Sequence, residues 1–161
     1  MKNLILKKSA EKFFRKIREE NNKLVFTNGC FDILHVGHIR YLKKAKEMGD
    51  YLVVGLNSDR SVKKLKGDNR PINIQKERAE MLLALESVDF VVIFNEKTPY
   101  KLIKKVKPDI LVKGGDWKVE DIVGSDIVQS YGGDVRSISY IEGKSTTNII
   151  EKIKKRYGDC K

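Results

Sequence analysis

The most informative segment of the sequence is Thr27-Asn28-Gly29-Cys30-Phe31-Asp32-Ile33-Leu34-His35-Val36-Gly37-His38, which follows the apolar run Leu24-Val25-Phe26. A short apolar run before a glycine-containing turn predicts a buried strand. Residues 37–48 have the apolar spacing of a helix that packs on the core through Ile39, Leu42 and Ala45. The quoted stretch is therefore predicted to connect the end of a strand to the start of a helix.

Strands and helices are predicted to alternate along the rest of the chain. Further strands are expected at residues 51–56, 90–94, 110–112 and 135–140. Helices are expected at residues 8–19, 74–85, 99–106, 122–131 and 145–157, with Asn73 capping the second of them and residues 57–71 forming a long polar connection. This alternation favours an α/β fold: a Rossmann-like, doubly wound, parallel five-stranded sheet with helices on both faces. The length favours one domain, residues 1–161, with an N-terminal helix in residues 1–20 and a core at 23–157.

Composition sets limits on location and partners. The formal net charge is +11, and the lysines are mixed with glutamates along the whole chain. This charge suits nucleic acid, a membrane surface or anionic small substrates, although a solvated basic surface accounts for most of it. The two cysteines, Cys30 and Cys160, make no disulfide framework. Because neither a signal peptide nor an apolar run of about 20 residues is present, we expect a cytoplasmic protein.

Four polar clusters follow four of the predicted strands. The first is the quoted stretch itself, and the others lie at residues 57–66, 113–117 and 142–147. In a parallel sheet the carboxyl ends of the strands meet at one edge, where ligands bind. The last three clusters contribute the candidate residues Asn57, Asp59, Lys64, Lys66, Lys113, Gly114, Asp116, Trp117, Ser145 and Thr146.

His35 and His38, the only two histidines of the chain, form the strongest single signal. Residues three apart share one face of a helix, and a helix start offers unpaired N–H groups and partial positive charge to a phosphate. Taken singly, each histidine could be structural, and Cys30 with both histidines could also ligate zinc. Zinc sites use three or four protein ligands, and the chain has no second cluster, so no protein-bound metal is predicted.

With these residues in hand, the sequence resembles the cytidylyltransferase-like superfamily, whose signature is a His-x-x-His pair with glycine third. It is similar, more narrowly, to the adenylyltransferase domain of the bacterial ADP-heptose synthesis enzymes, over residues 28–41, 57–59, 65–71, 109–117 and 143–150. The resemblance implies transfer of AMP from ATP to D-glycero-β-D-manno-heptose 1-phosphate in lipopolysaccharide core synthesis. It implies a stand-alone enzyme without a fused kinase, a homodimer, and small-molecule substrates with no nucleic-acid or membrane partner.

The expected reaction is in-line attack of a sugar-phosphate oxygen on the α-phosphorus of ATP, with pyrophosphate leaving. His35 and His38 would bind the triphosphate, and Lys64 or Lys66 would close over it. The nucleotide would be held by Thr27, Gly29, Cys30, Phe31, Gly37, Arg78, Lys113, Gly114, Asp116, Ser145 and Thr146. The acceptor would meet Asp32, Asn57, Asp59 and Trp117. Mg²⁺ would arrive with ATP, held mainly by phosphate oxygens and water.

Two other functions remain open at this point. One is a transferase of the same superfamily that uses CTP or a different acceptor, such as glycerol 3-phosphate or FMN. The other is a nucleotide- or nucleic-acid-binding module without catalysis, for which the net charge of +11 is the only support. The sequence lacks aromatic residues interleaved with a basic stripe, which single-strand binding uses.

Overall fold

The protein folds around a five-stranded parallel sheet. The computed structural model describes residues 3–139 and 145–158. The strands lie in the order β3-β2-β1-β4-β5, and every neighbouring pair is parallel. Their bounds are β1 Leu24–Gly29, β2 Tyr51–Asn57, β3 Phe90–Phe94, β4 Ile110–Gly114 and β5 Asp134–Ile138. The predicted α/β class, the Rossmann-like parallel sheet and the number of strands are confirmed.

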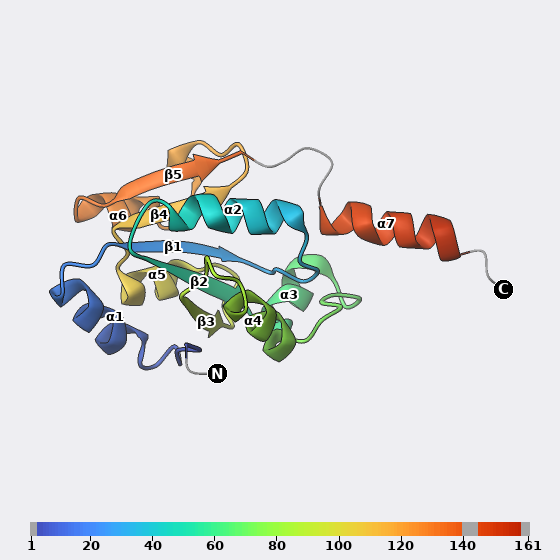
Figure 1. Cartoon of the computed structure of the whole chain (residues 1–161), viewed down its shortest axis with the longest axis horizontal. Coiled ribbons are helices and arrows are strands. Elements are labelled where there is room, and N and C mark those ends of the chain that lie inside the picture. Colours follow the sequence, from blue (N-terminus) through green and yellow to red (C-terminus); the bar gives the residue numbers. More distant parts are fainter. Residues whose placement is uncertain (1–2, 140–144, 159–161) are drawn as a thin grey trace.

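Helices cover both faces of the sheet (Figure 1). On one face pack α2 (Val36–Lys46) and α4 (Gln75–Leu83), and on the other pack α1 (Ala10–Glu19), α5 (Tyr100–Val106) and α6 (Ser125–Ser130). Strand β1 shows why two cores form, since Val25 belongs to the first cluster while Leu24 and Phe26 belong to the second. Successive side chains of a strand point to opposite faces, so one apolar run supplies both cores.

Two elements complete the order of the chain: the 3₁₀ turn η1 (Val119–Asp121) before α6, and α7 (Thr146–Tyr157). Helix α7 projects away from the sheet on the side of the strands' carboxyl ends (Figure 1). None of its side chains is buried among the described residues. No helix in the described part of the chain is long and apolar enough to span a membrane.

The structure corrects the prediction of a long connection at residues 57–71. That segment contains α3 (Asp59–Lys66), whose first turn is capped by the Ser58 hydroxyl, which accepts a hydrogen bond from the Ser61 N–H. Only Ser61 and Val62 of this helix are buried, so its basic sequence lacks the apolar stripe that identifies most helices. The tertiary contacts of these two residues, rather than hydrophobic periodicity, place the helix.

Three smaller predictions are also wrong. Asn73 does not cap the helix that follows, because its side-chain amide donates to the Asp32 carbonyl; Glu77 accepts from the Ile74 N–H instead. Ile39, predicted to lie in the core, is 44% exposed. The helix predicted at residues 122–131 is shorter, since Gly124 precedes its first turn with a positive φ of 91°. Tyr140 and residues 142–144 lie outside the described residues.

Candidate active site

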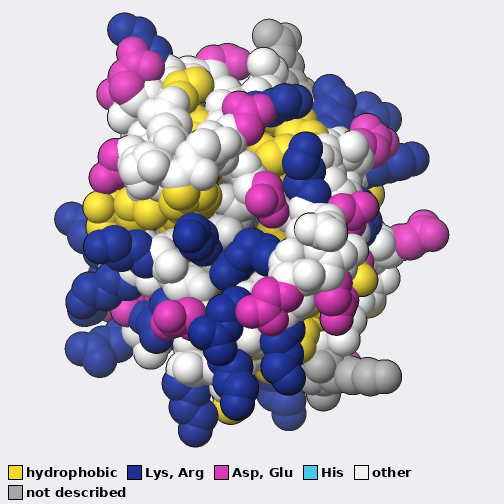
Figure 2. Space-filling model, turned by 90° about the vertical axis from the view of Figure 1, so that its left-hand side faces the viewer, with side chains coloured by type: hydrophobic (Ala, Val, Ile, Leu, Met, Phe, Trp, Pro, Cys, Tyr) yellow, Lys and Arg dark blue, Asp and Glu magenta, His cyan; other side chains and the backbone are white. Residues whose placement is uncertain are grey.

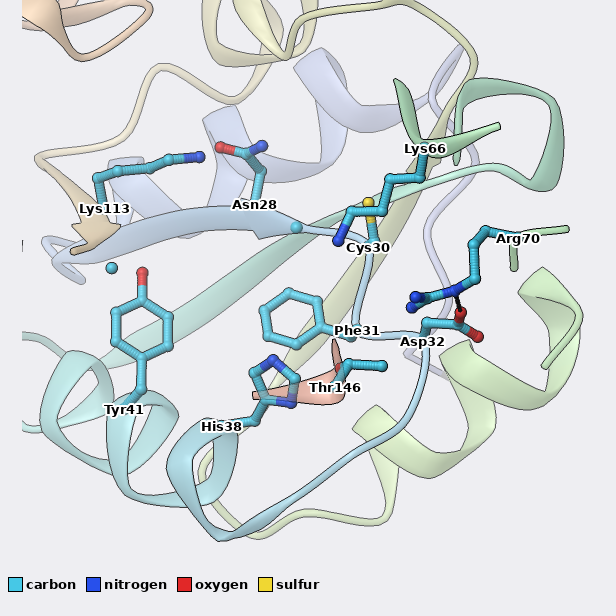
Figure 3. A pocket seen from close by; sticks show the side chains of 12 residues that line it. Asn28, Cys30, Phe31, Asp32, His38, Tyr41, Lys66, Arg70, Lys113 and Thr146 are labelled. Atoms are coloured by element: carbon cyan, nitrogen blue, oxygen red, sulfur yellow. Dashed lines mark hydrogen bonds and ion pairs between the residues drawn. The ribbon is translucent and has the colours of Figure 1, made fainter. Parts of the chain in front are cut away.

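A pocket of about 160 Å³ opens at the carboxyl ends of the strands. It collects residues from the turn after β1, from α2, from the end of α3 and the segment after it, from β4, and from the start of α7 (Figure 3). Its lining residues are Asn28, Gly29, Cys30, Phe31, Asp32, His38, Tyr41, Lys66, Arg70, Lys113, Gly114 and Thr146. Each of the four predicted clusters therefore contributes at least one residue to a single cavity.

The two histidines stack on one another at the start of α2. Their ring centroids are 3.8 Å apart with an interplanar angle of 24°, and His35 occupies the N-cap position. The edge of the Phe31 ring packs against His38, with centroids 5.1 Å apart. A Cβ on Gly29 would lie 2.9 Å from this phenyl ring, so glycine is required for the ring to support the imidazole. Gly37 lies between the histidines in the first turn of α2.

His38 is neutral at physiological pH. Burial lowers its pKa to about 4, with further lowering by the nearby His35 and Lys66. Its Nδ1 atom is enclosed and has no hydrogen-bond partner in the described part of the chain. A neutral imidazole carries one N–H donor and one acceptor nitrogen. His38 therefore offers a directed hydrogen bond toward the pocket, and not a positive charge.

Asp32 fixes the turn that carries the histidines. Its carboxylate accepts hydrogen bonds from the N–H groups of Ile72 and Asn73, at 2.8 and 2.9 Å, and from Arg70 Nε at 2.5 Å. Burial by itself raises the pKa of Asp32, but the hydrogen bonds from Asn73, Ile72 and Arg70 outweigh it and lower that pKa overall. The residue is thus an ionised anchor whose oxygens are already used inside the protein.

Arg78 is a second anchor and not a surface cation. Its side chain has no exposed area. It donates to the carbonyls of Cys30 and Asn73 and forms an ion pair with Asp59 at 2.8 Å. The expected contact between Arg78 and a phosphate does not fit this placement. The arginine instead ties the turn after β1 to the start of α3 and to the segment before α4.

Both candidate lysines on α3 are exposed, but of the two only Lys66 lines the pocket. On the opposite side stand Lys113 and Gly114 at the end of β4. Burial lowers the pKa of Lys113, and the nearby Cys30 opposes this shift. Lysines therefore approach the cavity from two directions.

The start of α7 forms another part of the wall. The Ser145 hydroxyl caps the helix by accepting from the Asn148 N–H at 3.1 Å. Thr146 lines the pocket, and its hydroxyl donates to the carbonyl of Ile33 at 3.3 Å. Helix α7 thus directs its N-terminus toward the cavity, as an anion site requires.

His35, Gly37 and Ser145 do not line this cavity, and neither do five further predicted site residues. Thr27 is fully buried and bonds to the Tyr41 hydroxyl, and Asn57 is buried and donates to Ser61. Asp59 pairs with Arg78, and Asp116 accepts from the Ser139 hydroxyl. The burial of Thr27 and Asn57 does not fit direct ligand contact. Trp117 lines an adjoining cavity of about 140 Å³ that shares Asn28 and Lys113 with the first.

Three lining residues are absent from the predicted set: Asn28, Tyr41 and Arg70. Tyr41 follows His38 by three residues on α2, so helical spacing could have placed it on the same face. Asn28 lies within residues 27–38, next to the predicted ligand Gly29. Arg70 lies within residues 65–71, one of the stretches that carry the family resemblance, but no pattern in that stretch marks it as a ligand.

Neither a metal site nor a reactive thiol is supported by the cysteine in the turn. No group of three or more potential ligands from His, Cys, Asp and Glu exists within residues 3–139 and 145–158. Burial raises the pKa of the Cys30 thiol, although Lys66 and Arg78 oppose the shift. A protonated thiol is a poor nucleophile, which agrees with a packing role for Cys30. Cys160 lies outside the described residues.

Known proteins with similar sequences match most of this chain. The chain is 61% identical over 140 residues to "Bifunctional protein HldE" of a Nitratiruptor species, covering 87% of the chain and 29% of that protein. It is 63% identical over 139 residues to "Bifunctional protein HldE" of Campylobacter fetus subsp. fetus, covering 86% of the chain and 30% of that protein. The chain thus spans less than a third of the length of these relatives.

Solved structures include a lipopolysaccharide core biosynthesis protein from Thermoplasma volcanium GSS1, with a TM-score of 0.60 and 31% identity, covering 76% of this chain and 99% of that one. A pantoate-beta-alanine ligase from Francisella tularensis shares the fold, with a TM-score of 0.57 and 18% identity, covering 94% of this chain and 76% of that one. The cytidylyltransferase-like family matches residues 26–152, which include the histidine turn, β4 and the start of α7. Since this match covers more than half of the sequence, the chain belongs to the cytidylyltransferase-like family.

Proposed function

We propose that the chain is an adenylyltransferase that joins AMP from ATP to D-glycero-β-D-manno-heptose 1-phosphate, giving ADP-heptose and pyrophosphate. The observation that carries this proposal is one cavity in which a neutral histidine, a lysine and a helix N-terminus face the same space. Each of these groups donates to phosphate oxygens. Membership of the cytidylyltransferase-like family supports nucleotidyl transfer as the reaction.

The mechanism needs no general base, because the attacking phosphate oxygen is already an anion. Its nucleophilic oxygen forms a bond to the α-phosphorus of ATP while the bond to the β-phosphate oxygen breaks, and pyrophosphate departs. Catalysis then depends on holding the reactants in line and on stabilising the charge that develops at phosphorus. In this proposal His38 donates to the α-phosphate, while His35 orients its ring by stacking.

The other groups around the cavity bind the two ends of the nucleotide. Lys66 and the start of α7, with Ser145 and Thr146, would hold the β- and γ-phosphates. Lys113 and Gly114 would lie beside the adenosine at the end of β4, with Asp116 near the ribose. Trp117, at the adjoining cavity, would meet the acceptor.

The residues that line the cavity are compatible with a magnesium ion bound mainly to the phosphates of ATP. Asp32 is the only carboxylate among the described lining residues, and its oxygens accept hydrogen bonds from Arg70, Ile72 and Asn73. Phosphate oxygens and water would therefore supply most of the ligands. When bound, Mg²⁺ would neutralise part of the triphosphate charge.

The identity of the acceptor rests on the relatives and not on the cavity. The sequence resembles the ADP-heptose synthesis enzymes, and one related structure is named as a lipopolysaccharide core biosynthesis protein. We extend the proposal to that pathway, to a cytoplasmic location where ATP is available, and to a homodimer. We include no nucleic-acid partner in the proposal; on the face shown in Figure 2, basic side chains gather in the lower part and acidic ones lie among the basic ones elsewhere.

The proposal is tested by incubating the protein with ATP and D-glycero-β-D-manno-heptose 1-phosphate and detecting the nucleotide sugar by mass. A parallel panel replaces ATP by CTP, and the heptose phosphate by glycerol 3-phosphate or FMN, with pyrophosphate release as the readout. ADP-heptose formed with ATP alone is the expected result. Faster turnover of CTP or of another acceptor would reassign the enzyme within its family.

A further inference from the structure

We propose that Arg70 is a phosphate-binding residue of the pocket, held in its working position by Asp32. The inference deepens the proposed function, on which it rests, by assigning a ligand for one of the two reacting phosphate groups. Arg70 belongs to the segment between α3 and α4 and lines the cavity together with Lys66 and His38. Three observations carry it: the way the guanidinium is held, the hydrogen bonds it lacks, and the side of the cavity it occupies.

The guanidinium is held at one edge only. Its Nε donates to Asp32 Oδ2 at 2.5 Å, and the side chain of Asp32 is 1% exposed. The same carboxylate accepts from the N–H groups of Ile72 and Asn73, so Asp32 cannot move without breaking several bonds. An arginine fixed through Nε presents its two terminal nitrogens as a ready fork, which is the geometry that grips a phosphate.

The terminal nitrogens have no acceptor in the described part of the chain. Nη2 is enclosed and makes no hydrogen bond with the described residues, while 14% of the side chain as a whole stays exposed. A buried guanidinium N–H without a partner is costly, by roughly 1–3 kcal/mol. Phosphate oxygens are acceptors of the right charge to satisfy both nitrogens. A brace that served only the loop would not need to leave them unpaired.

Arg70 also lies on the side of the cavity opposite Lys113, where the adenosine is proposed to bind. In Figure 3 it lies with Asp32 across the pocket from Tyr41 and Lys113, with His38 and Thr146 between the two sides. The adenosine is proposed to lie by Lys113 and Gly114, so Arg70 faces the phosphate end. In-line transfer places the incoming phosphate and the departing pyrophosphate on opposite sides of the reacting phosphorus. The two terminal nitrogens of Arg70 can bind the incoming phosphate or the departing pyrophosphate, because both groups present anionic phosphate oxygens.

The test compares Arg70→Ala and Arg70→Lys with Arg136→Ala as a matched control. Arg136 also donates from Nε to a carboxylate, Asp134 at 2.6 Å, but its side chain is 53% exposed and it does not line the pocket. We would measure the KM for the heptose phosphate at saturating ATP, the KM for ATP at saturating acceptor, and calorimetric binding of ATP, pyrophosphate and inorganic phosphate. Arg70→Lys retains a cation beside Asp32, so it preserves the test should the alanine variant fold poorly.

We expect Arg70→Ala to weaken one phosphate ligand about tenfold or more, and Arg136→Ala to leave all values unchanged. If only the KM of the heptose phosphate rises, Arg70 binds the phosphate of the acceptor. If the binding of ATP and pyrophosphate weakens instead, Arg70 binds the leaving group. Arg70→Ala and Arg70→Lys proteins with wild-type melting and wild-type values for every ligand would overturn the proposal. If wild-type protein turned over no heptose phosphate, the proposed function would fall, while the calorimetry would still decide the role of Arg70.

Discussion

Two parts of the pocket wall are held in very different ways. The turn after β1 is cross-linked to the segment before α4 by Asp32 and Arg78, both of which are buried. Helix α7 has no buried side chain and touches the turn through the Thr146–Ile33 hydrogen bond. Preorganisation is therefore concentrated in the turn, where the histidines lie, while α7 contributes mainly through its own capped N-terminus.

Replacing Arg78 should cause the largest loss of stability, because it removes contacts that hold the turn after β1. Arg78→Ala leaves the Asp59 carboxylate and the carbonyl of Cys30 without their partner inside the protein. Arg78 is fully buried, whereas the Asp59 carboxylate left behind is 32% exposed. We therefore expect a loss in the free energy of unfolding near the lower end of the about 3–5 kcal/mol that breaking a buried ion pair costs. Denaturant titration measures it, with Arg136→Ala as an exposed control that should change by less than about 1 kcal/mol. A loss below about 1 kcal/mol for Arg78→Ala would show that the turn is not braced in this way.

His38 should affect turnover far more than stability. Its imidazole faces the pocket, and removing one donor to developing charge costs about 10²–10³ in kcat. We expect His38→Ala to lower kcat by this factor while the melting temperature stays close to that of the wild type, since His38 packs mainly against His35 and Phe31. Near-normal kcat for this variant would remove the histidine pair from the mechanism.

The low pKa of His38 predicts a loss of stability in acid. The unfolded chain takes up a proton at His38 near the ordinary histidine pKa of 6.5, whereas the folded protein does so at a pKa of about 4. The unfolded state therefore binds more protons between these values, and the free energy of unfolding falls as the pH drops from 6.5 to 4, by up to about 3 kcal/mol. His38→Gln should lose less over this window in thermal melts. If the wild type and His38→Gln lost equal stability between pH 6.5 and 4, the pKa of His38 would not be lowered by burial as described.

The two regions also differ in how well sequence predicts them. The strands and the histidine turn are predictable because apolar runs, glycines and a His-x-x-His pair report directly on burial and a helix start. Helix α3 escapes prediction because it lacks an apolar stripe, and the contact that anchors it, from the Ser61 hydroxyl to the Glu96 carbonyl, is tertiary. Its serine cap, Ser58, is the one local signal that could have indicated a helix start. Lys64 and Lys66 are indistinguishable in the sequence because the register of that helix is set by those contacts.

The roles of buried charges cannot be predicted from sequence. The sequence favours a surface cation or a phosphate ligand at Arg78, since lysines and arginines are mostly exposed. Its acceptors lie at Cys30, Asp59 and Asn73, and two of these are backbone carbonyls that have no sequence signature. The family resemblance covers Arg70 without indicating its role, because the Asp32 carboxylate that holds it is 38 residues away.

The lysines of α3 give a sharper test of which side chains reach the phosphates. Lys66 lines the cavity and Lys64 does not. We expect Lys66→Ala to lower kcat/KM for ATP about tenfold or more, because a charge-assisted hydrogen bond to phosphate is lost. Lys64→Ala, a change of the same size and charge on the same helix, should stay within about twofold. Equal effects of the two substitutions would mean that α3 contributes only a general positive field.

The smallest expected effect compares the caps of two helices. Ser58 caps α3 beside the braced turn and is 2% exposed, whereas Ser145 caps α7. Losing a cap costs about 1 kcal/mol. Since α7 packs no buried side chain on the core, Ser145→Ala should leave global unfolding unchanged and speed amide exchange in α7 about fivefold. Ser58→Ala should instead lower the global free energy of unfolding by about 1 kcal/mol. If Ser145→Ala lowered global stability as much as Ser58→Ala, then α7 would unfold together with the core, and the contrast between the two walls would not hold.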